Sequence, residues 1–284
     1  MAYLMMFTET QPQPKSFRDD TFAESYEFIA CIGEGGYGKV YSAIHHHNQT
    51  QHAVKVIPND KCRHKTYCPC RDTNIPDEVL LWEELDHPGI VKLQAIYYEA
   101  DSWILVMEYE PQFVDLFYYI DQHGVMTSSE AAHILRQLLD ICSYLALQGV
   151  DHRDIKDENI LYNPSTKQIK LIDFGSASLL TSAQYTFFRG TDVYIPPEFW
   201  TKGHYYPCSA TVFSIGCLAY ILLNGDSPFD KRQDVINFTG KLESLQAYTN
   251  LLGEVESDFI KGCLCPDPFL RPSLPELVGH MFLQ

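Results

Sequence analysis

The stretch VDHRDIKDENIL at residues 150–161 decides the fold and the chemistry of this chain. It places a lysine two residues after Asp154 and an asparagine five residues after it. DFG follows at residues 173–175, directly after the strand-like segment QIKLI. Phosphoryl transfer requires a proton acceptor, a cation and oxygen ligands for a metal ion. The pattern assigns these roles to Asp154, Lys156, Asn159 and Asp173.

A glycine-rich segment, IGEGGYGKV, lies upstream at residues 32–40 and contains the spacing G-x-G-x-x-G in Gly33, Gly35 and Gly38. The residues that follow continue as a strand, so the loop joins two strands and does not open a helix as a dinucleotide-binding loop would. Glycine lets the backbone approach phosphate oxygens and donate N–H hydrogen bonds to them. A plain glycine-rich hairpin remains an alternative for this segment taken alone.

Lys55 lies inside an apolar strand that contains AVK at residues 53–55. An unpaired ammonium group costs several kcal/mol in such a place, so this lysine needs an anion. Glu78, in the next predicted helix, is the natural partner, and nucleotide phosphates are a second one. The alternative is a surface lysine on an edge strand.

Strand and helix patterns divide the chain near residue 111. Between Tyr26 and residue 109, short segments rich in β-branched and aromatic residues predict five strands, with one helix that begins near residue 76. After the hinge at about 108–112, amphipathic helices predominate up to residue 284. The pattern predicts an α+β fold in which a small strand-rich lobe (about 26–109) and a helical lobe (about 113–284) flank a ligand cleft.

The sequence also predicts the character of the N-terminal segment and the positions of helices in the helical lobe. Residues 1–25 are polar and show no sustained period, so we expect a flexible N-terminal arm. In the helical lobe, Ser128 or Ser129 is the expected N-cap of a long helix with Glu130 in its first turn. Further helices are expected at 209–224, 241–252, 255–264 and 274–281.

Composition limits the range of partners. The 284 residues carry a formal net charge of -16, which disfavours nucleic acid and anionic membranes and favours basic partners. The N-terminus lacks the pattern of a secretory signal, and no sufficiently long apolar run predicts a membrane span. The nine cysteines are too scattered for a disulfide scaffold. We therefore expect a chain with reduced cysteines in the cytoplasm or nucleus.

These motifs together resemble the eukaryotic protein kinase domain over about residues 26–283. Lys156 within HRDIK is similar to serine/threonine kinases, and HRDIKDENIL, KLIDFGSA, GTDVYIPPE and NGDSPF look most like the PIM kinase family. The helix that begins near Thr211 lacks the aspartate that most kinases carry there, an absence that PIM kinases share. The resemblance implies a bilobal kinase that acts as a monomer, uses ATP and Mg²⁺, and phosphorylates Ser/Thr hydroxyls in basic, Arg-rich protein segments.

The resemblance also implies a role for each matching residue. Asp154 would be the catalytic base, Lys156 would neutralise the γ-phosphate, and Thr191 would bond both. Lys55, paired to Glu78, would hold the α- and β-phosphates, while Asn159 and Asp173 would hold Mg²⁺. The remaining ATP-binding positions are Ile32, Gly33, Glu34, Gly35, Gly36, Tyr37, Gly38, Lys39, Val40, Ala53, Met107, Glu108, Glu110, Leu161 and Ile172. The implied peptide-binding positions are Asp115, Asp157, Glu158, Asp226 and Asp230, and the structural positions are His152, Arg153, Phe174, Glu198 and Arg271.

Three departures from the family pattern leave alternatives open. Phe187 occupies the place of the usual activating phosphate, so either a phosphate on Thr186 steadies Arg153 or the packing of Phe187 and Phe188 holds the segment, and packing is favoured. Pro111 lies one position later than in PIM hinges, which leaves the Glu110 N–H to an adenine ring. The insert at residues 61–70 brings together Cys62, His64, Cys68 and Cys70, either as a zinc site or, as we expect, as reduced thiols.

A second class of function also remains open. A pseudokinase scaffold would bind nucleotide without efficient turnover, and the rearranged activation segment favours this hypothesis weakly. Lys55, Glu78, Asp154, Asn159 and Asp173 are all present, and this argues for an active enzyme.

Overall fold

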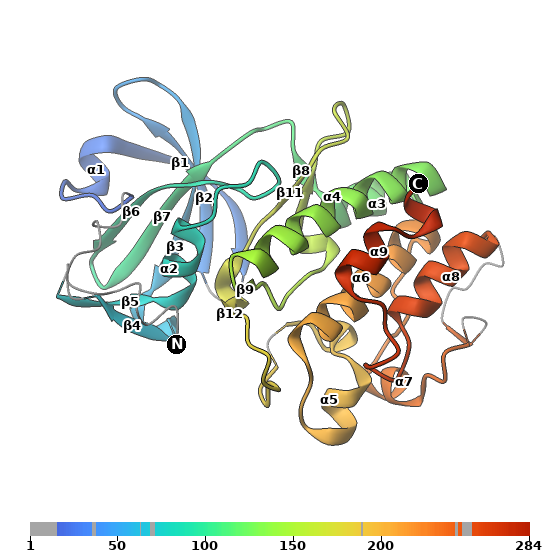
Figure 1. The fold of residues 1–284 in the computed structure, drawn as a ribbon. Coiled ribbons are helices and arrows are strands. Elements are labelled where there is room, and N and C mark those ends of the chain that lie inside the picture. The colour runs from blue at the N-terminus through green and yellow to red at the C-terminus, as the bar shows by residue number, and fades with distance from the viewer. Residues whose placement is uncertain are drawn as a thin grey trace. The chain divides into compact units, whose positions relative to one another are not determined.

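The computed structural model forms two compact units (Figure 1). It describes residues 16–35, 38–62, 64–68, 72–188, 190–241, 244–245 and 252–284. Unit 1 takes the chain up to Asp86 together with Val91–Pro111, and unit 2 takes His87–Ile90 and Gln112–Gln284. The chain thus passes finally from one unit to the other after Pro111, next to the boundary expected near residue 111.

Unit 1 is built on an antiparallel sheet in the order β1-β2-β3-β7-β6. The strands are β1 (Tyr26–Gly35), β2 (Gly38–His45), β3 (Gln51–Pro58), β6 (Leu93–Glu99) and β7 (Ser102–Glu108). Helix α2 (Asp77–Glu83) buries Val79, Leu80, Leu81 and Trp82. The five expected strands and the one expected helix are therefore confirmed.

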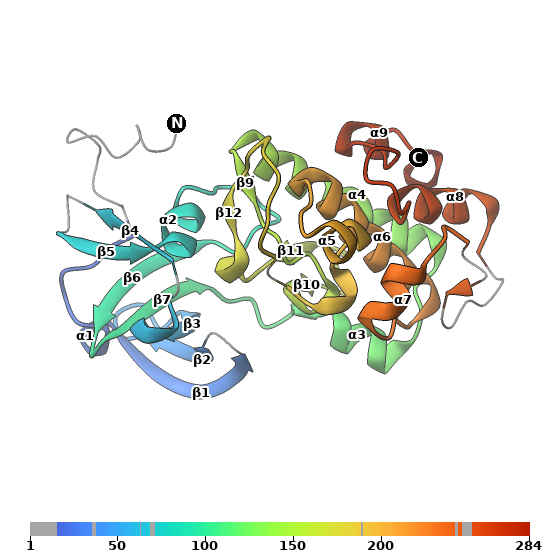
Figure 2. The same ribbon diagram turned by 90° about the horizontal axis from the view of Figure 1, so that it is seen from below.

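A short hairpin, which the sequence pattern did not predict, adds to unit 1. Strands β4 (Lys65–Cys68) and β5 (Thr73–Pro76) pair antiparallel, and β5 lies next to α2 (Figure 2). Cys68 and Ile75 are buried in this hairpin, at 1% and 0% exposure. The insert at residues 61–70 is thus partly strand rather than a loose loop.

Residues 16–25 pack against the sheet, so the expectation of a flexible arm was wrong for this segment. The Ile96 N–H donates to the Ser16 carbonyl oxygen at 2.7 Å, and the Arg18 N–H donates to the Ile96 carbonyl oxygen at 3.1 Å. Helix α1 (Phe22–Ser25) then buries Phe22 in the core between Tyr26 and Tyr97. The partners of this segment are distant in the sequence, so local periodicity could not reveal them.

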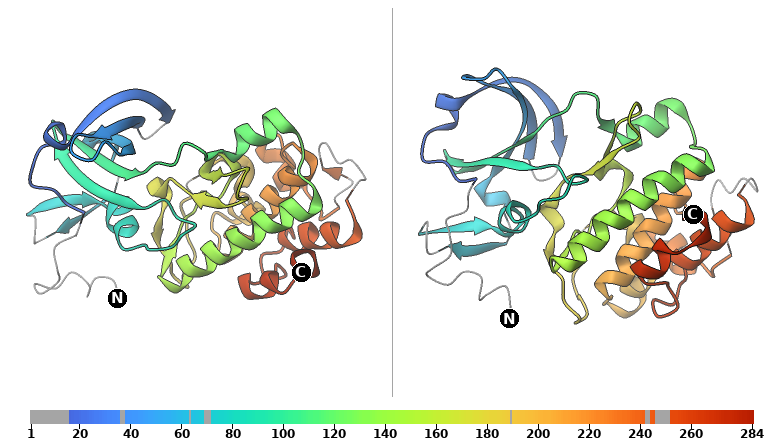
Figure 3. Two further views of the ribbon diagram at one scale, coloured as in Figure 1. Left: turned by 90° about the horizontal axis from the view of Figure 1, so that it is seen from above. Right: turned by 45° about the horizontal axis from the view of Figure 1, so that its top comes forward.

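Unit 2 is mainly helical. Its helices are α3 (Leu116–His123), α4 (Ser128–Leu147), α5 (Pro197–Lys202), α6 (Pro207–Asn224), α7 (Arg232–Asn237), α8 (Glu254–Cys263) and α9 (Leu274–Val278). Figure 3 shows the long green helix α4 running beside the orange helix α6, which also packs on α8. Helix α6 is long and apolar enough to cross a membrane, but 78% of that window is buried inside the structure, as in the core helix of a soluble domain.

Short strands position the loops of unit 2. Strands β8 (Val114–Asp115), β10 (Ile160–Tyr162) and β11 (Ile169–Leu171) form a small sheet in the order β11-β10-β8. Strands β9 (Val150–Asp151) and β12 (Ser178–Leu179) form a second, two-stranded pair. The segments that contain HRD and DFG are therefore fixed at the ends of paired strands.

Several helix boundaries differ from the sequence prediction. The N-cap of α4 is Thr127, not Ser128 or Ser129, because Thr127 and Glu130 form a reciprocal capping box. Helix α7 was not predicted, and the helix expected at 241–252 falls largely outside the described residues. The last helix ends at Val278, and a 3-10 turn follows at Met281–Leu283.

Glu198 and Arg271, two of the predicted structural positions, form a buried bridge. Two parallel hydrogen bonds, of 2.8 and 2.7 Å, join the guanidinium to the carboxylate, and the side chains are 0% and 3% exposed. Arg271 also donates to the carbonyl oxygens of Cys265 and Ser209, at 2.8 and 3.1 Å. Because its donors are satisfied, this buried charge is tolerated, and it ties α5 to the start of α6 and to the loop after α8.

The packing of Phe22 yields a stability prediction. Phe22 is 4% exposed, so Phe22→Ala should destabilise unit 1 by about 3–5 kcal/mol, measured by urea unfolding. Phe269, which is 72% exposed, provides a matched control, and Phe269→Ala should change stability by less than about 0.5 kcal/mol. Equal unfolding midpoints for the two variants would contradict the packing of residues 16–25.

Candidate active site

The glycine-rich loop joins β1 and β2 in unit 1, as predicted. Gly33 pairs with Val40, and Gly35 pairs with Gly38, while Gly36 and Tyr37 lie outside the described residues. A side chain at Gly38 would collide with the Val56 carbonyl oxygen of β3, so the neighbouring strand alone already requires this glycine. The phosphate-binding argument from sequence is therefore not the only reason for Gly38.

The other loop residues expected at ATP differ in exposure. Ile32 is 46% exposed on β1, whereas Ala53 on β3 is buried at 7%. Glu34 and Lys39 form an exposed ion pair of 3.6 Å across the hairpin, and such pairs contribute little to stability. The outer residues of this loop are therefore accessible to solvent.

Lys55 and Glu78 form the predicted pair. The Lys55 Nζ atom lies 3.4 Å from the Glu78 Oε2 atom, and the side chains are only 10% and 14% exposed. Strand β3 positions Lys55 opposite Leu105 of β7, and the first turn of α2 carries Glu78. Burial makes this contact matter, because the charge of the ammonium would otherwise be uncompensated.

The hinge positions lie at the end of β7. Met107 is 7% exposed and pairs with Ala53, while the Glu108 N–H donates to the Lys92 carbonyl oxygen at 3.0 Å. The Glu108 N–H is thus used within unit 1. A hydrogen bond between the Glu110 N–H and an adenine ring stays a prediction.

In unit 2, Asp154 lies between Asn159 and Lys156. The Asn159 side-chain amide donates to the Asp154 Oδ2 atom at 2.9 Å and to the Asp154 carbonyl oxygen at 2.8 Å. The Lys156 Nζ atom lies 3.8 Å from the same carboxylate and donates to the Thr191 Oγ1 atom at 3.0 Å. The structure therefore brings four residues, all predicted as catalytic or metal-binding, into one cluster.

The charge of Lys156 is maintained despite partial burial. Burial favours the neutral amine, but the carboxylates of Asp154 and Glu158 outweigh this effect and raise the pKa of Lys156. The Lys156–Glu158 ion pair is 3.0 Å long. At neutral pH the cluster therefore contains a permanent cation.

The DFG segment begins with a left-handed residue. Asp173 has φ 61° and ψ 81°, and its Oδ1 atom accepts a hydrogen bond from the Gly175 N–H at 3.1 Å. The His152 Nε2–H group donates to the Ile172 carbonyl oxygen at 3.0 Å, and the His152 ring contacts Phe174 edge-on at 4.9 Å. Burial lowers the pKa of His152, so its imidazole is neutral at pH 7. His152 and Phe174 are thus in contact within unit 2, and their structural roles stay a prediction.

Leu161 and Ile172, the two predicted ATP positions of unit 2, follow the catalytic loop. Leu161 lies on β10 between Lys170 and Asp115, and the Ile172 N–H donates to the Asn159 carbonyl oxygen at 3.0 Å. Ile172 therefore fixes Asn159, a predicted metal ligand, to the segment that precedes Asp173.

The activation segment is held by packing and by Arg153. The Arg153 guanidinium donates to the Phe187 carbonyl oxygen at 2.6 Å and lies 5.0 Å from the centroid of the Tyr185 ring. The Phe188 ring packs at 5.0 Å from Tyr205, whereas Phe187 is 58% exposed. The packing hypothesis is thus supported, but Phe188 provides the packing and the expectation for the Phe187 side chain was wrong.

The five carboxylates expected at the peptide are not equivalent. Asp157 is 5% exposed and accepts a hydrogen bond from the Tyr194 hydroxyl at 2.9 Å, so its assignment to the peptide site was wrong. Asp115 caps α3 by accepting the Tyr118 N–H at 3.0 Å, and burial raises its pKa. Glu158, Asp226 and Asp230 are exposed, as a peptide site requires.

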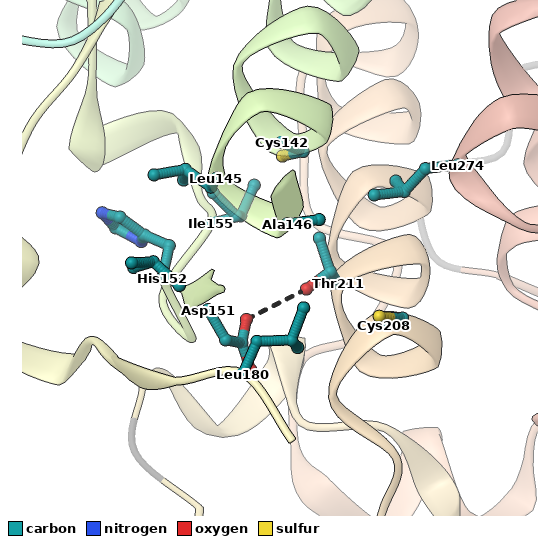
Figure 4. Close-up of a pocket in the computed structure, with 11 residues that line it drawn as sticks. Cys142, Leu145, Ala146, Asp151, His152, Ile155, Leu180, Cys208, Thr211 and Leu274 are labelled. Carbon is teal, nitrogen blue, oxygen red and sulfur yellow. Dashed lines mark hydrogen bonds between the residues drawn. The ribbon is translucent and has the colours of Figure 1, made fainter. Parts of the chain in front are cut away.

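Sequence reasoning missed two residues beside the catalytic loop. Asp151 is buried and accepts a hydrogen bond from the Thr211 hydroxyl at 3.3 Å (Figure 4). Gly190 has φ 127°, and a side chain there would lie 3.0 Å from the Asp154 Oδ1 atom. The signal for Asp151 was present, since a carboxylate stands alone in the apolar stretch before HRD.

The cysteine insert provides no described metal site. Cys70 lies outside the described residues, and among those described no group of His, Cys, Asp or Glu is arranged to hold a metal ion. The Cys62 thiol lies 3.6 Å from the Pro58 carbonyl oxygen, and burial raises its pKa to about 11. Reduced thiols, the favoured expectation, agree with this geometry.

Comparison with known proteins identifies the family. A model described as the protein kinase domain matches residues 26–283. The chain belongs to the protein kinase family. The kinase is 31% identical over 271 residues to serine/threonine-protein kinase pim-2 of Danio rerio, covering 92% of this chain and 86% of that protein. It is 32% identical over 264 residues to serine/threonine-protein kinase prk-2 of Caenorhabditis elegans, covering 93% of this chain and 59% of that protein.

A third relative has a different context. The kinase is 31% identical over 257 residues to a PAS domain-containing serine/threonine-protein kinase of Mus musculus, covering 89% of this chain and 18% of that protein. The relatives share the class of activity, so the chain is a protein serine/threonine kinase that uses ATP and a divalent metal.

The contacts of Phe188 and Arg153 predict that phosphate on Thr186 is dispensable. Thr186→Ala should retain activity within about twofold, because the Phe187 carbonyl oxygen already engages Arg153. Phe188→Ala should lower kcat by more than Thr186→Ala does, since it removes the ring that packs on Tyr205. Initial rates of peptide phosphorylation, with mass analysis of the activation segment, test both. A large loss in Thr186→Ala, together with phosphate on Thr186 in the parent, would refute the packing hypothesis.

Proposed function

We propose that this chain is an active, PIM-like serine/threonine kinase that uses Mg²⁺ and phosphorylates hydroxyls in basic, Arg-rich protein segments. The observation that carries the proposal is the cluster of Asp154, Lys156, Asn159 and Thr191, joined by contacts of 2.9 to 3.8 Å. A proton acceptor is held next to a cation there, the arrangement that phosphoryl transfer to a hydroxyl needs.

The donor set of unit 2 fits Mg²⁺. Asp173 offers carboxylate oxygens, and Asn159, which directs its amide nitrogen at Asp154, offers its amide oxygen; both are ligands of the hard kind that Mg²⁺ prefers. When bound with ATP, the ion neutralises phosphate charge. The chain itself supplies Asp154, which accepts the hydroxyl proton, and Lys156, which stabilises negative charge on the transferred group.

In unit 1, Lys55 is the proposed ligand of the α- and β-phosphates. Glu78 holds the ammonium at 3.4 Å in a nearly buried setting, which limits the conformations of a long, flexible side chain. The intact pair supports nucleotide binding, which a pseudokinase scaffold would share. The cluster around Asp154 is what supports turnover, and nothing in the described residues favours the scaffold.

The preference for basic segments is supported by charge. The chain carries a net charge of -16, and Glu158, Asp226 and Asp230 are exposed carboxylates of unit 2. Arginine forms strong, bidentate hydrogen bonds with such groups. Since Asp157 is buried and Asp115 is half-buried, the preference rests on fewer carboxylates than the sequence indicated.

Phosphate transfer from MgATP to an Arg-rich serine peptide tests the activity. Asp154→Asn should lower kcat by about 10²- to 10⁴-fold, because it removes the positioned base. Asp140→Asn, at a carboxylate that is 76% exposed on α4, should leave the rate unchanged. Nucleotide binding without transfer in the parent protein would replace the proposal by the scaffold function.

Charge reversal tests the substrate preference separately. The double variant Asp226→Lys and Asp230→Lys should lower kcat/KM for the Arg-rich peptide by roughly tenfold, because attraction becomes repulsion. Asp258→Lys, at a side chain that is 81% exposed, provides the control for net charge alone. A panel in which acidic or Pro-directed peptides react best, or an equal loss with an uncharged peptide, would rule out the basic preference.

A further inference from the structure

A buried carboxylate lies directly before the catalytic loop. Asp151 is on β9 and is 6% exposed, and its Oδ1 atom accepts a hydrogen bond from the Thr211 hydroxyl of α6 at 3.3 Å (Figure 4). The Arg153 backbone N–H lies near the same carboxylate and lowers its pKa. The carboxylate thus connects the core helix of unit 2 to the residue that precedes Asp154.

Arg153 needs such a contact because its backbone is strained. Its φ of 67° lies in the left-handed region, which a residue with a side chain rarely adopts unless its surroundings fix it. Asp154 is the next residue, so the conformation of Arg153 sets the direction in which the catalytic carboxylate points. A side-chain acceptor two residues earlier, anchored to α6, stabilises this conformation.

We infer that Asp151 is a positioning residue for phosphoryl transfer, whose carboxylate, anchored by Thr211, holds the left-handed backbone of Arg153 and thereby the orientation of Asp154. The guanidinium of Arg153 extends this arrangement to the activation segment through its hydrogen bond to the Phe187 carbonyl oxygen. The buried Arg153 Nε atom has no hydrogen-bond acceptor in the described part of the chain. The positive charge of Arg153 attracts the carboxylate of Asp151. The carboxylate of Asp151 therefore balances the charge of Arg153, as a phosphate on the activation segment would.

The energetics of burial argue against a purely structural role. Burial raises the pKa of Asp151 to about 6, although the Arg153 charge, the Thr211 hydroxyl and the Arg153 backbone N–H act in the opposite direction. The charged form is thus disfavoured by the fold, and a neutral side chain of similar size would be better tolerated. A fold that retains a costly charge at this position uses that charge for something other than stability.

Most of the groups that face Asp151 do not change charge near the pH at which Asp151 titrates. The neighbours come from its own loop, from α4, from α6 and from the activation segment: Arg153, His152, Cys142, Cys208, Thr211, Tyr185 and Tyr205. The thiols and phenols among them have raised pKa values and are neutral at pH 5–8, and Arg153 is always charged. His152 has a lowered pKa, so it titrates on the acid side of its usual range.

The sign of the pH effect follows. As the pH falls through about 6, Asp151 gains a proton and loses its hold on Arg153, so kcat should decline. Thr211→Val removes a donor that favours the charged form, raises the pKa of Asp151 and should move this decline to higher pH. Thr201→Val removes a helical threonine hydroxyl that bonds the Pro197 carbonyl oxygen, and as the control it should leave the decline in place.

Asp151→Asn separates positioning from stability. It should lower kcat at pH 8 by about ten- to hundredfold, with little change in KM for ATP, because the amide keeps an acceptor oxygen but loses the charge that strengthens its contacts. Its Tm at pH 8 should equal or exceed that of the parent, because the raised pKa means that the parent loses stability as the pH rises through about 6. In the Asp151→Asn background, Thr211→Val should no longer move the pH profile.

The experiment combines kcat against pH, KM for ATP and Tm for the parent, the two single variants, their double variant and the Thr201→Val control. It uses whichever serine peptide the parent phosphorylates best, so it rests on the kinase activity and not on the proposed preference for basic segments. Full activity of Asp151→Asn, a parallel fall in its Tm and kcat, or an unmoved acid decline in Thr211→Val would each overturn the inference. Should Asp151→Asn fail to fold, the shift in Thr211→Val decides alone.

Discussion

The partly buried charge of Arg153 is the constraint on which the active part of unit 2 depends. Its guanidinium donates to the Phe187 carbonyl oxygen in the activation segment, and the carboxylate of Asp151, on the strand before the catalytic loop, attracts its charge. Asp154 is the next residue, so its orientation depends on the backbone conformation of Arg153. Loop, activation segment and core helix are thus coupled through one residue, which makes the catalytic geometry a property of the whole unit.

Much of this could be read from the sequence, because catalytic chemistry restricts residue type and spacing together. Lys55 combines a charge with an apolar context, and a charge in that context requires a partner, which Glu78 provides. The Glu198–Arg271 bridge was instead implied by the resemblance to protein kinases. Such pairs can be predicted over long separations. The alternation of apolar residues in the strands of unit 1 likewise has one stable solution, a sheet with a buried face.

What could not be read depends on which way a side chain faces. Asp157 and Glu158 are neighbours, yet one is buried against Tyr194 and the other is exposed, since the short 3-10 turn that carries them has no period long enough to assign faces. Phe187 and Phe188 are also neighbours with different surroundings, since the Phe187 side chain is exposed and the Phe188 ring packs against Tyr205. Residues 16–25 escaped prediction because their hydrogen bonds close a long loop and leave no local pattern.

The packing of residues 16–18 on β6 also covers part of the edge of the sheet. Strand β6 ends the strand order of unit 1, so its outer N–H and C=O groups would be open to another chain. The hydrogen bonds of Ile96 to Ser16 and Arg18 occupy two of these groups and place a non-continuing segment along the edge. The N-terminal segment therefore protects the kinase against edge-to-edge strand pairing, and proteolytic trimming there would favour aggregation before it affected catalysis.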